Sequence, residues 1–130
     1  MNARTITTDE SGQTMTEFAI ILPVLVVLLF GIIQFGIAFM HSVTLTDAVR
    51  AGARKAAVSR TAANPTQAAT TAVLGAATDL DPSKLSVNVT SSWVSGNTVT
   101  VNATYPYQIN LLGIVVASGS LHSSTTERVE

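Results

Sequence analysis

The sequence predicts an α+β fold: a long N-terminal helix, then a short helix and a small antiparallel β-sheet. Three observations lead to this prediction. Residues 18–40 form an uncharged apolar run, small and apolar residues then recur at helical spacing to about residue 60, and apolar and polar residues alternate from Leu85 onward. Because helices repeat every 3.6 residues and strands every two, the change of period separates the helices from the sheet.

The first helix is predicted over residues 13–60, after a polar and disordered stretch at residues 1–12, with a transmembrane span at residues 18–40. At 1.5 Å per residue this span is about 35 Å long, enough for the roughly 30 Å of bilayer hydrocarbon. A buried core helix is the alternative, but the residues downstream are too few to bury a helix that is apolar on all sides. Pro23 removes a backbone donor, so we expect it to interrupt and kink the helix inside the membrane.

The second half of this helix is amphipathic and carries a stripe of small residues. Ala48, Gly52 and Ala56 are spaced four residues apart, so they share one face on which another backbone can approach closely. We interpret this stripe as a helix-packing surface toward other subunits. Arg50 and Arg54 lie on a neighbouring face, which we interpret as solvated, with a phosphate or headgroup contact as the alternative.

A small α+β domain is predicted over residues 61–130, and it begins with a second helix. Asn64 suits the N-cap, Pro65 the first helical position, and Gln67 the third, while residues 79–82 end the helix.

The sheet is predicted from two clearly alternating segments and one weaker one. Residues 85–89, with Trp93 continuing the same face, and residues 99–105 alternate, and the turn between them is expected at residues 95–97. Residues 120–129 are a candidate third strand. The segment 106–118 is apolar but too short to span a bilayer, so we expect it to cover the sheet or meet a partner.

Composition excludes several classes of function. The net charge of −1 gives no reason to expect nucleic acid as a partner, and without cysteine neither a disulfide nor a thiolate site can form. His41 lies at the expected membrane boundary, and His122 lies in a Ser/Thr-rich strand with no carboxylate at metal-ligand spacing. We therefore predict no catalytic residues, no metal, no cofactor and no enzymatic activity.

Glu17 is the last charged residue before the apolar run, and its position is the most informative one in the chain. In the simplest interpretation it marks the water boundary of the membrane. If the chain were cut after Gly12, however, the new amine of Gln13 would lie one helical turn from this carboxylate, and their pairing would offset part of the cost of desolvation. The partner amine is the protein's own or a neighbour's.

This arrangement resembles a known class of processing signal. A short hydrophilic leader ending in Gly12, Glu17 at the fifth position after it, and an apolar helix are similar to the class III signal of type IV pilin-like proteins. With "GQTMTEFAIILPVLVVLLFGIIQFG" and "LTDAVRAGARKAAV", the chain resembles the TadE-like family of the tight-adherence (Flp-type) pilus systems over residues 12–58. Gln34 departs from the acidic residue that is common there in relatives.

The resemblance implies a function, partners and a location. It implies a pilin-like component, a pseudopilin or minor pilin, for assembly of a surface adherence pilus. Its leader, residues 1–12, is removed by prepilin peptidase between Gly12 and Gln13, and Glu17 and Phe18 make assembly contacts. The implied partners are other pilin-like subunits, the pilus assembly machinery and membrane lipid. The implied location is the bacterial inner membrane, single-pass, with the C-terminal domain extracytoplasmic or carried into the pilus.

Two observations leave alternatives open. Arg50, Arg54, Lys55 and Arg60 follow the span, so the positive-inside rule favours the opposite orientation, with the C-terminal domain in the cytoplasm. The span is longer than the apolar region of a secretory signal, although a cut before Phe39 is a minor alternative. The competing hypothesis for function is an unprocessed, membrane-anchored binding module of the cell envelope.

Overall fold

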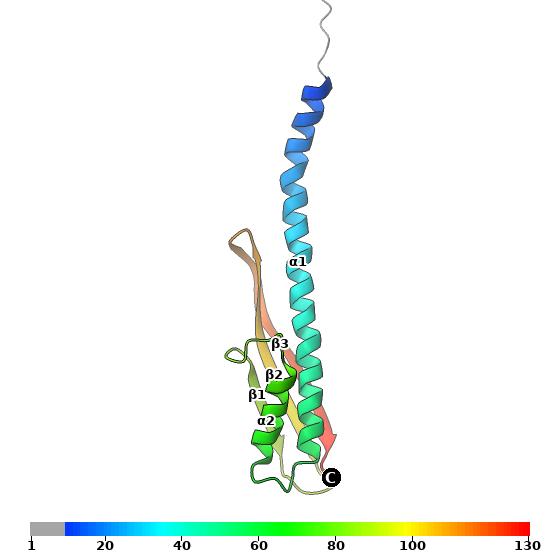
Figure 1. Cartoon of the computed structure of the whole chain (residues 1–130), viewed down its shortest axis with the longest axis vertical. Helices are drawn as coiled ribbons and strands as arrows, with labels where there is room; N and C mark the ends of the chain where they lie inside the picture. Colours follow the sequence, from blue (N-terminus) through cyan, green and yellow to red (C-terminus); the bar gives the residue numbers. More distant parts are fainter. Residues whose placement is uncertain (1–9) are drawn as a thin grey trace, which may run out of the picture.

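The computed structural model describes residues 10–130; residues 1–9, most of the predicted leader, lie outside this part. Figure 1 shows one long helix running the length of the molecule, with a second helix and a sheet beside its C-terminal half. The α+β class predicted from the sequence is confirmed. The elements in chain order are α1 (Glu10–Ala57), α2 (Pro65–Ala76), β1 (Ser86–Ser91), β2 (Thr98–Leu111) and β3 (Ile114–Arg128).

Helix α1 begins earlier and ends earlier than the predicted 13–60, and Pro23 does not interrupt it. The α-helical hydrogen-bonding pattern continues through Pro23 from Glu10 to Ala57. The expected interruption was wrong because proline deletes only one backbone hydrogen bond, and the bonds of the adjoining turns hold the helix together. At the other end of α1, the N–H of Glu130 donates to the carbonyl of Ala57 at 3.0 Å and satisfies an acceptor that the last turn of the helix leaves free.

Helix α2 starts where the sequence predicted. Asn64 is the N-cap, and its side-chain oxygen accepts a hydrogen bond from the N–H of Gln67 at 3.0 Å. This bond satisfies one of the backbone donors that the first turn of a helix leaves free. The helix ends at Ala76, shortly before the predicted stop.

The sheet is an antiparallel meander in the order β1-β2-β3. Strand β2 lies in the centre, and its residues alternate between buried and half-exposed as far as Tyr105. The first turn contains Gly96, whose φ of +86° suits glycine. Trp93 lies beyond the end of β1 and has a φ of +54°, but its side chain packs against the core with Val87 and Val89, as expected.

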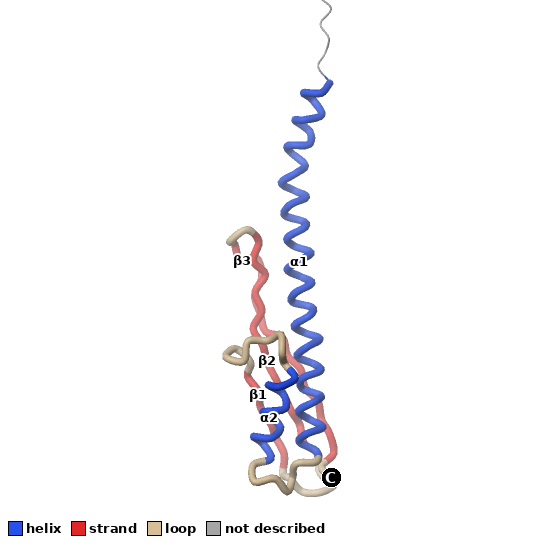
Figure 2. Tube along the Cα trace, viewed as in Figure 1, coloured by secondary structure: helices blue, strands red, loops and turns tan. Residues whose placement is uncertain are grey.

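The apolar segment 106–118 belongs to the sheet, which corrects our expectation that it covers the sheet; the other expectation, that it meets a partner, stays a prediction. Its residues lengthen β2 and β3 into a two-stranded hairpin that projects past β1, as Figure 2 shows. We call residues 106–120 the hairpin arm. A bulge between Ile109 and Asn110 interrupts its register, and this irregularity, with apolar residues on both faces, hides the strand period from sequence analysis.

The core lies between the sheet and the two helices. The C-terminal half of α1 packs on β2 and β3, while α2 packs on α1 and touches β1. Most of the side chains that meet here are small or medium-sized, with Tyr105 and Trp93 as large exceptions, so the helices and the sheet approach closely. The fully buried larger side chains are Leu45, Val49, Val73, Val99, Val101 and Val129.

Candidate functional site: the uncovered half of α1

The N-terminal half of α1 is apolar, and no other part of the described chain covers it. Its most apolar 18-residue window is 0% buried, and the helix is long and apolar enough to cross a membrane. Side chains such as Phe18, Leu28 and Phe35 are all more than half exposed. Exposing such a surface to water would be costly, so this half of the helix needs lipid or another protein around it.

The predicted cleavage residues lie in the first turns of α1. Gly12 and Gln13 are both helical and exposed, and no atom lies within 4 Å of where a Cβ of Gly12 would be. The carbonyl oxygen of Gly12 accepts a hydrogen bond from the Thr16 hydroxyl at 3.0 Å. The peptide bond after Gly12 is therefore accessible from the side but held in a helical conformation.

Gln13 and Glu17 lie on one face of α1, as their spacing predicts. The side-chain amide Nε2 of Gln13 donates to Oε1 of Glu17 at 3.1 Å. The next residue, Phe18, is 57% exposed and begins the apolar run. The structure thus brings the side chains of Gln13 and Glu17 together, beside Phe18.

The small-residue stripe does make a close helix contact, but the helix that approaches it is the chain's own α2. Ala48 and Ala56 are fully buried. A Cβ on Gly52 would meet a side-chain carbon of Val73 at 2.2 Å and the carbonyl oxygen of Ala69 at 3.3 Å. This corrects the expectation of a packing surface for other subunits, because α2 occupies the stripe. The sequence shows that another backbone packs closely on this stripe, but it does not show which helix supplies that backbone.

The face of α1 that carries Arg50 and Arg54 is solvated, as we first interpreted it. Arg50 donates to Oδ1 of Asp47 at 3.3 Å, and both side chains are more than half exposed. Arg54 is exposed as well. An exposed ion pair of this kind contributes little to stability.

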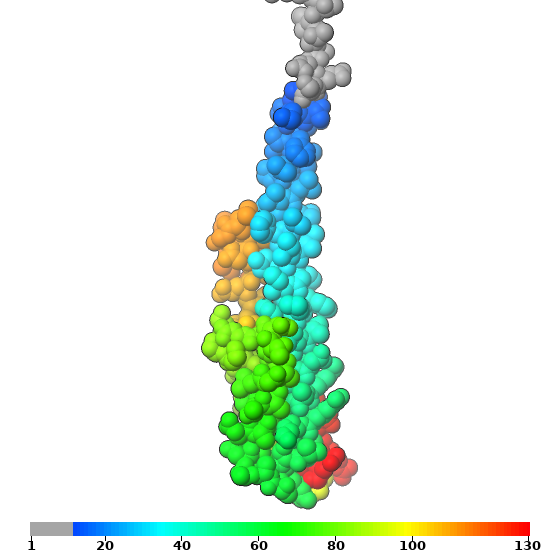
Figure 3. Space-filling view, viewed as in Figure 1, coloured from blue at the N-terminus to red at the C-terminus, as the bar shows by residue number. Residues whose placement is uncertain are grey.

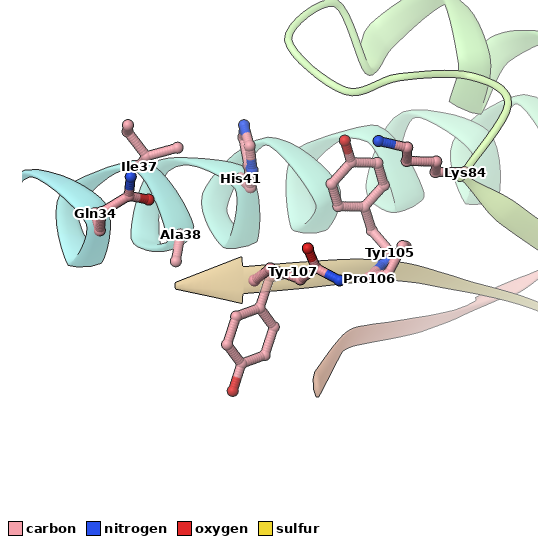
Figure 4. Close-up of a pocket in the computed structure, with 9 residues that line it drawn as sticks. Gln34, Ile37, Ala38, His41, Lys84, Tyr105, Pro106 and Tyr107 are labelled. Atoms are coloured by element: carbon pink, nitrogen blue, oxygen red, sulfur yellow. The ribbon is translucent and has the colours of Figure 1, made fainter. Parts of the chain in front are cut away.

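A small cavity lies where the hairpin arm meets α1. It has a volume of about 230 Å³ and is lined by Gln34 and His41 of α1, Tyr105 of β2 and Lys84 of the loop before β1, among others. Figure 4 shows the ring of Tyr107 pointing away from the other labelled side chains. The rings of His41 and Tyr105 meet edge to face at 5.5 Å between centroids. Gln34, the only strongly polar residue of the span, therefore faces the domain.

Lys84 does not make this cavity an anion site, because it is already paired. Its Nζ lies 3.8 Å from Oδ2 of Asp81. Hydrogen bonds from the Ser83 side chain and backbone, together with Lys84, lower the pKa of Asp81 from its ordinary value of 3.8, so this carboxylate stays charged beside the lysine. Among residues 10–130, no group of His, Asp and Glu side chains is placed to hold a metal ion.

The hairpin arm, which lies near the apolar run of α1, was not predicted from the sequence. One signal was present in the sequence: no charged residue occurs between Lys84 and Glu127. This gap marks a long stretch of the chain as poor in charge, and the hairpin arm lies within it.

Comparison with known proteins agrees with the resemblance inferred from the residues. Residues 12–54 match the family model described as TadE-like protein. The matched region contains the predicted cleavage residues, the apolar run and most of the stripe, while α2 and the sheet lie outside it. Neither the curated proteins nor the solved structures contain a match to this chain.

Proposed function

From the match of residues 12–54 to the TadE-like family, which associates the chain with the tight-adherence pilus, we propose that this protein is a pilin-like assembly component. Prepilin peptidase removes residues 1–12, and the mature chain works as a pseudopilin or minor pilin held in the inner membrane by α1. The observation that carries the proposal is the placement of Gly12 and Glu17 in the first turns of α1, directly before an apolar run whose N-terminal part nothing in the described chain covers.

Processing is the first part to test. Intact mass of the protein from its native membrane is expected to show a chain that begins at Gln13. Gly12→Val should retain the leader, since a β-branched side chain crowds a site shaped for glycine. Gly31→Val is the matched control, because Gly31 is also helical and no atom lies within 4 Å of where its Cβ would be, and it should be processed normally. A wild-type chain that still begins at Met1 would favour the alternative, an unprocessed membrane-anchored binding module.

Assembly is the second part, and it depends on Glu17. After cleavage, the α-amine of Gln13 lies in the turn whose side chain already reaches the Glu17 carboxylate. Removing the charge leaves an ammonium beside hydrocarbon without its partner. Glu17→Gln should therefore be cleaved normally but recover less of the pilus partners in a pull-down. Asp47→Asn, another exposed carboxylate on α1, is the control and should recover them fully.

Orientation is the third part, because the cations after the span favour the opposite side by the positive-inside rule. The proposal places the domain outside the cytoplasm. The chain has no cysteine, so Val94→Cys, in an exposed turn of the domain, is a single reporter. A membrane-impermeant maleimide should label it in cells whose inner membrane is intact. Labelling only after that membrane is opened would contradict the proposed orientation.

A further inference from the structure

The hairpin arm lies alongside the apolar part of α1, although it comes from the opposite end of the chain. Tyr107, Ile109 and Leu121 line a cavity of about 270 Å³ together with Phe35 and Phe39 of α1, among others. Figure 3 shows the end of the arm, in orange, against α1 and well beyond the rest of the domain. The arm therefore runs from the domain toward the span.

The composition of the arm changes along its length. Near the domain the arm has one apolar and one polar face. Tyr107 and Ile109 are half-buried toward α1, while Gln108 and Asn110 are exposed. At its turn both sides are apolar. The exposed fractions there are 64% for Leu112, 70% for Ile114, 51% for Val115 and 54% for Val116. A surface that docks on a protein needs one apolar face, whereas a surface that is apolar all round suits hydrocarbon.

The backbone conformation of the turn also suits hydrocarbon. Leu112 and Gly113 both have positive φ, 52° and 91°, as in a type I′ turn, where asparagine is the usual first residue. A leucine here accepts an unfavourable conformation and places an apolar side chain at the very end. Oδ1 of Asn110 accepts a hydrogen bond from the Gly113 N–H at 2.9 Å, so the turn satisfies this donor without water.

From these observations we propose that the turn of the hairpin arm, residues 111–116, inserts into the membrane leaflet on the domain's side, as a second membrane contact beside α1. The inference rests on α1 spanning the membrane, as proposed above. Leu112 lies about 13 Å beyond Gln108 at roughly 3.3 Å per strand residue. One headgroup layer is only about 5 to 8 Å deep, so a turn whose arm enters at Gln108 reaches the hydrocarbon.

The open edges of the arm limit the depth of insertion to the turn. A two-stranded ribbon leaves backbone groups unpaired along both edges, and hydrocarbon cannot satisfy them. Pro106 has no N–H to leave unpaired, and it lies where β2 passes beyond the end of β1. Tyr107, directly before Gln108, lies at the level where tyrosine is enriched in membrane proteins, while Tyr105 is buried in the core of the domain.

Because the chain has no cysteine, single-cysteine variants carrying an environment-sensitive fluorophore test this directly. Leu112→Cys reports the turn, Ile32→Cys reports the span, and Val94→Cys reports an exposed apolar position in the turn at the other end of the sheet. The full chain is reconstituted in phosphatidylethanolamine–phosphatidylglycerol vesicles. Quenching is then compared between lipids that carry a spin label on the acyl chain and iodide in the water.

The expected result is that the labels at Leu112 and Ile32 are quenched by lipid to a similar extent and not by iodide, and that the label at Val94 behaves in the opposite way. Adding Ile114→Asp to the Leu112→Cys protein should move its label back to iodide, because a carboxylate is costly in hydrocarbon.

Three results would overturn the inference, each for a different reason. A Leu112 label that iodide reaches and lipid does not places the turn in water. A Leu112 label shielded from both quenchers means that a protein surface, such as a second copy of the chain, covers the turn. An Ile32 label that lipid does not quench shows that α1 does not span the membrane, and it removes the proposed anchor together with this inference.

Discussion

Leu29 and Leu45 belong to the same helix, yet Leu29 is 56% exposed and Leu45 is 1% exposed. The same contrast holds for glycine. Nothing lies within 4 Å of a Cβ position on Gly31, whereas Gly52 is in contact with α2. Up to about residue 33, α1 presents its side chains to surroundings outside the chain, and from Leu45 onward it forms the core of a domain. An apolar residue in α1 therefore contributes to the stability of the domain only in the C-terminal half.

The largest effect is expected from truncating the buried leucine. Leu45→Ala should lower the free energy of unfolding of the domain by about 2 to 5 kcal/mol, because it removes buried methyl groups and leaves a cavity. Leu29→Ala should change it by less than about 0.5 kcal/mol. Urea unfolding in detergent measures both, followed by the fluorescence of Trp93, the single tryptophan, which packs against the core. Equal losses in the two variants would contradict the division of α1.

Substituting the two glycines tests the same difference between the halves of α1, by adding side-chain volume instead of removing it. Gly52→Leu should destabilise the domain by about 1 to 3 kcal/mol, since its side chain has to displace Val73 and the backbone at Ala69. Gly31→Leu meets no atoms and should leave the domain unchanged. Thermal unfolding read from Trp93 separates them. A stable Gly52→Leu variant would mean that α2 does not hold its place against α1.

A smaller effect is expected at the start of α2, the helix that covers the stripe. Asn64→Ala removes the acceptor for the Gln67 N–H and should cost about 1 kcal/mol. Gln67→Ala keeps this N–H and is the control, with little change expected. Both are measured by urea unfolding. If the two variants lose the same stability, the cap is not the source of the effect.

The smallest effect is a dependence on pH in the loop before β1. Because the pKa of Asp81 is lowered in the folded protein, its contribution is present above the ordinary value of 3.8 and is lost as the pH falls through the folded pKa. Asp81→Asn should therefore reduce the difference in unfolding midpoint between neutral pH and about pH 3. Asp79→Asn, two residues earlier, is the control. An unchanged difference in Asp81→Asn would remove this carboxylate as a source of the dependence.

Local signals in the sequence predicted well wherever short-range chemistry decides the structure. The Asn64 cap, the turn around Gly96 and the alternation of β2 were predicted from neighbouring residues, and the structure confirms each of them. The fold class followed from the change in period alone. The exposure of the apolar run in α1 was likewise predicted, because the run is too apolar for the small domain to bury.

Long-range features were not predictable in the same way. The stripe of Ala48, Gly52 and Ala56 shows that a backbone approaches, but whether it belongs to α2 or to another subunit depends on how the chain turns back after residue 57. The hairpin arm was missed because the bulge at Ile109 shifts the strand period and the turn is apolar on both sides. Pro23 does not interrupt the helix, since the cost of one missing hydrogen bond is local and the helix around it is long; the kink expected there stays a prediction.

The continuity of α1 has a consequence for the angle at which the domain faces its neighbours. No linker separates the apolar run from the domain. The rotation of the domain about the axis of α1 is therefore fixed by the rotation of residues 18–40 about the same axis. Inserting one alanine between Met40 and Leu45 would rotate the domain by about 100° relative to Glu17, at 3.6 residues per turn. The direction in which the sheet faces is thereby set by the same helix that carries Glu17 and Phe18.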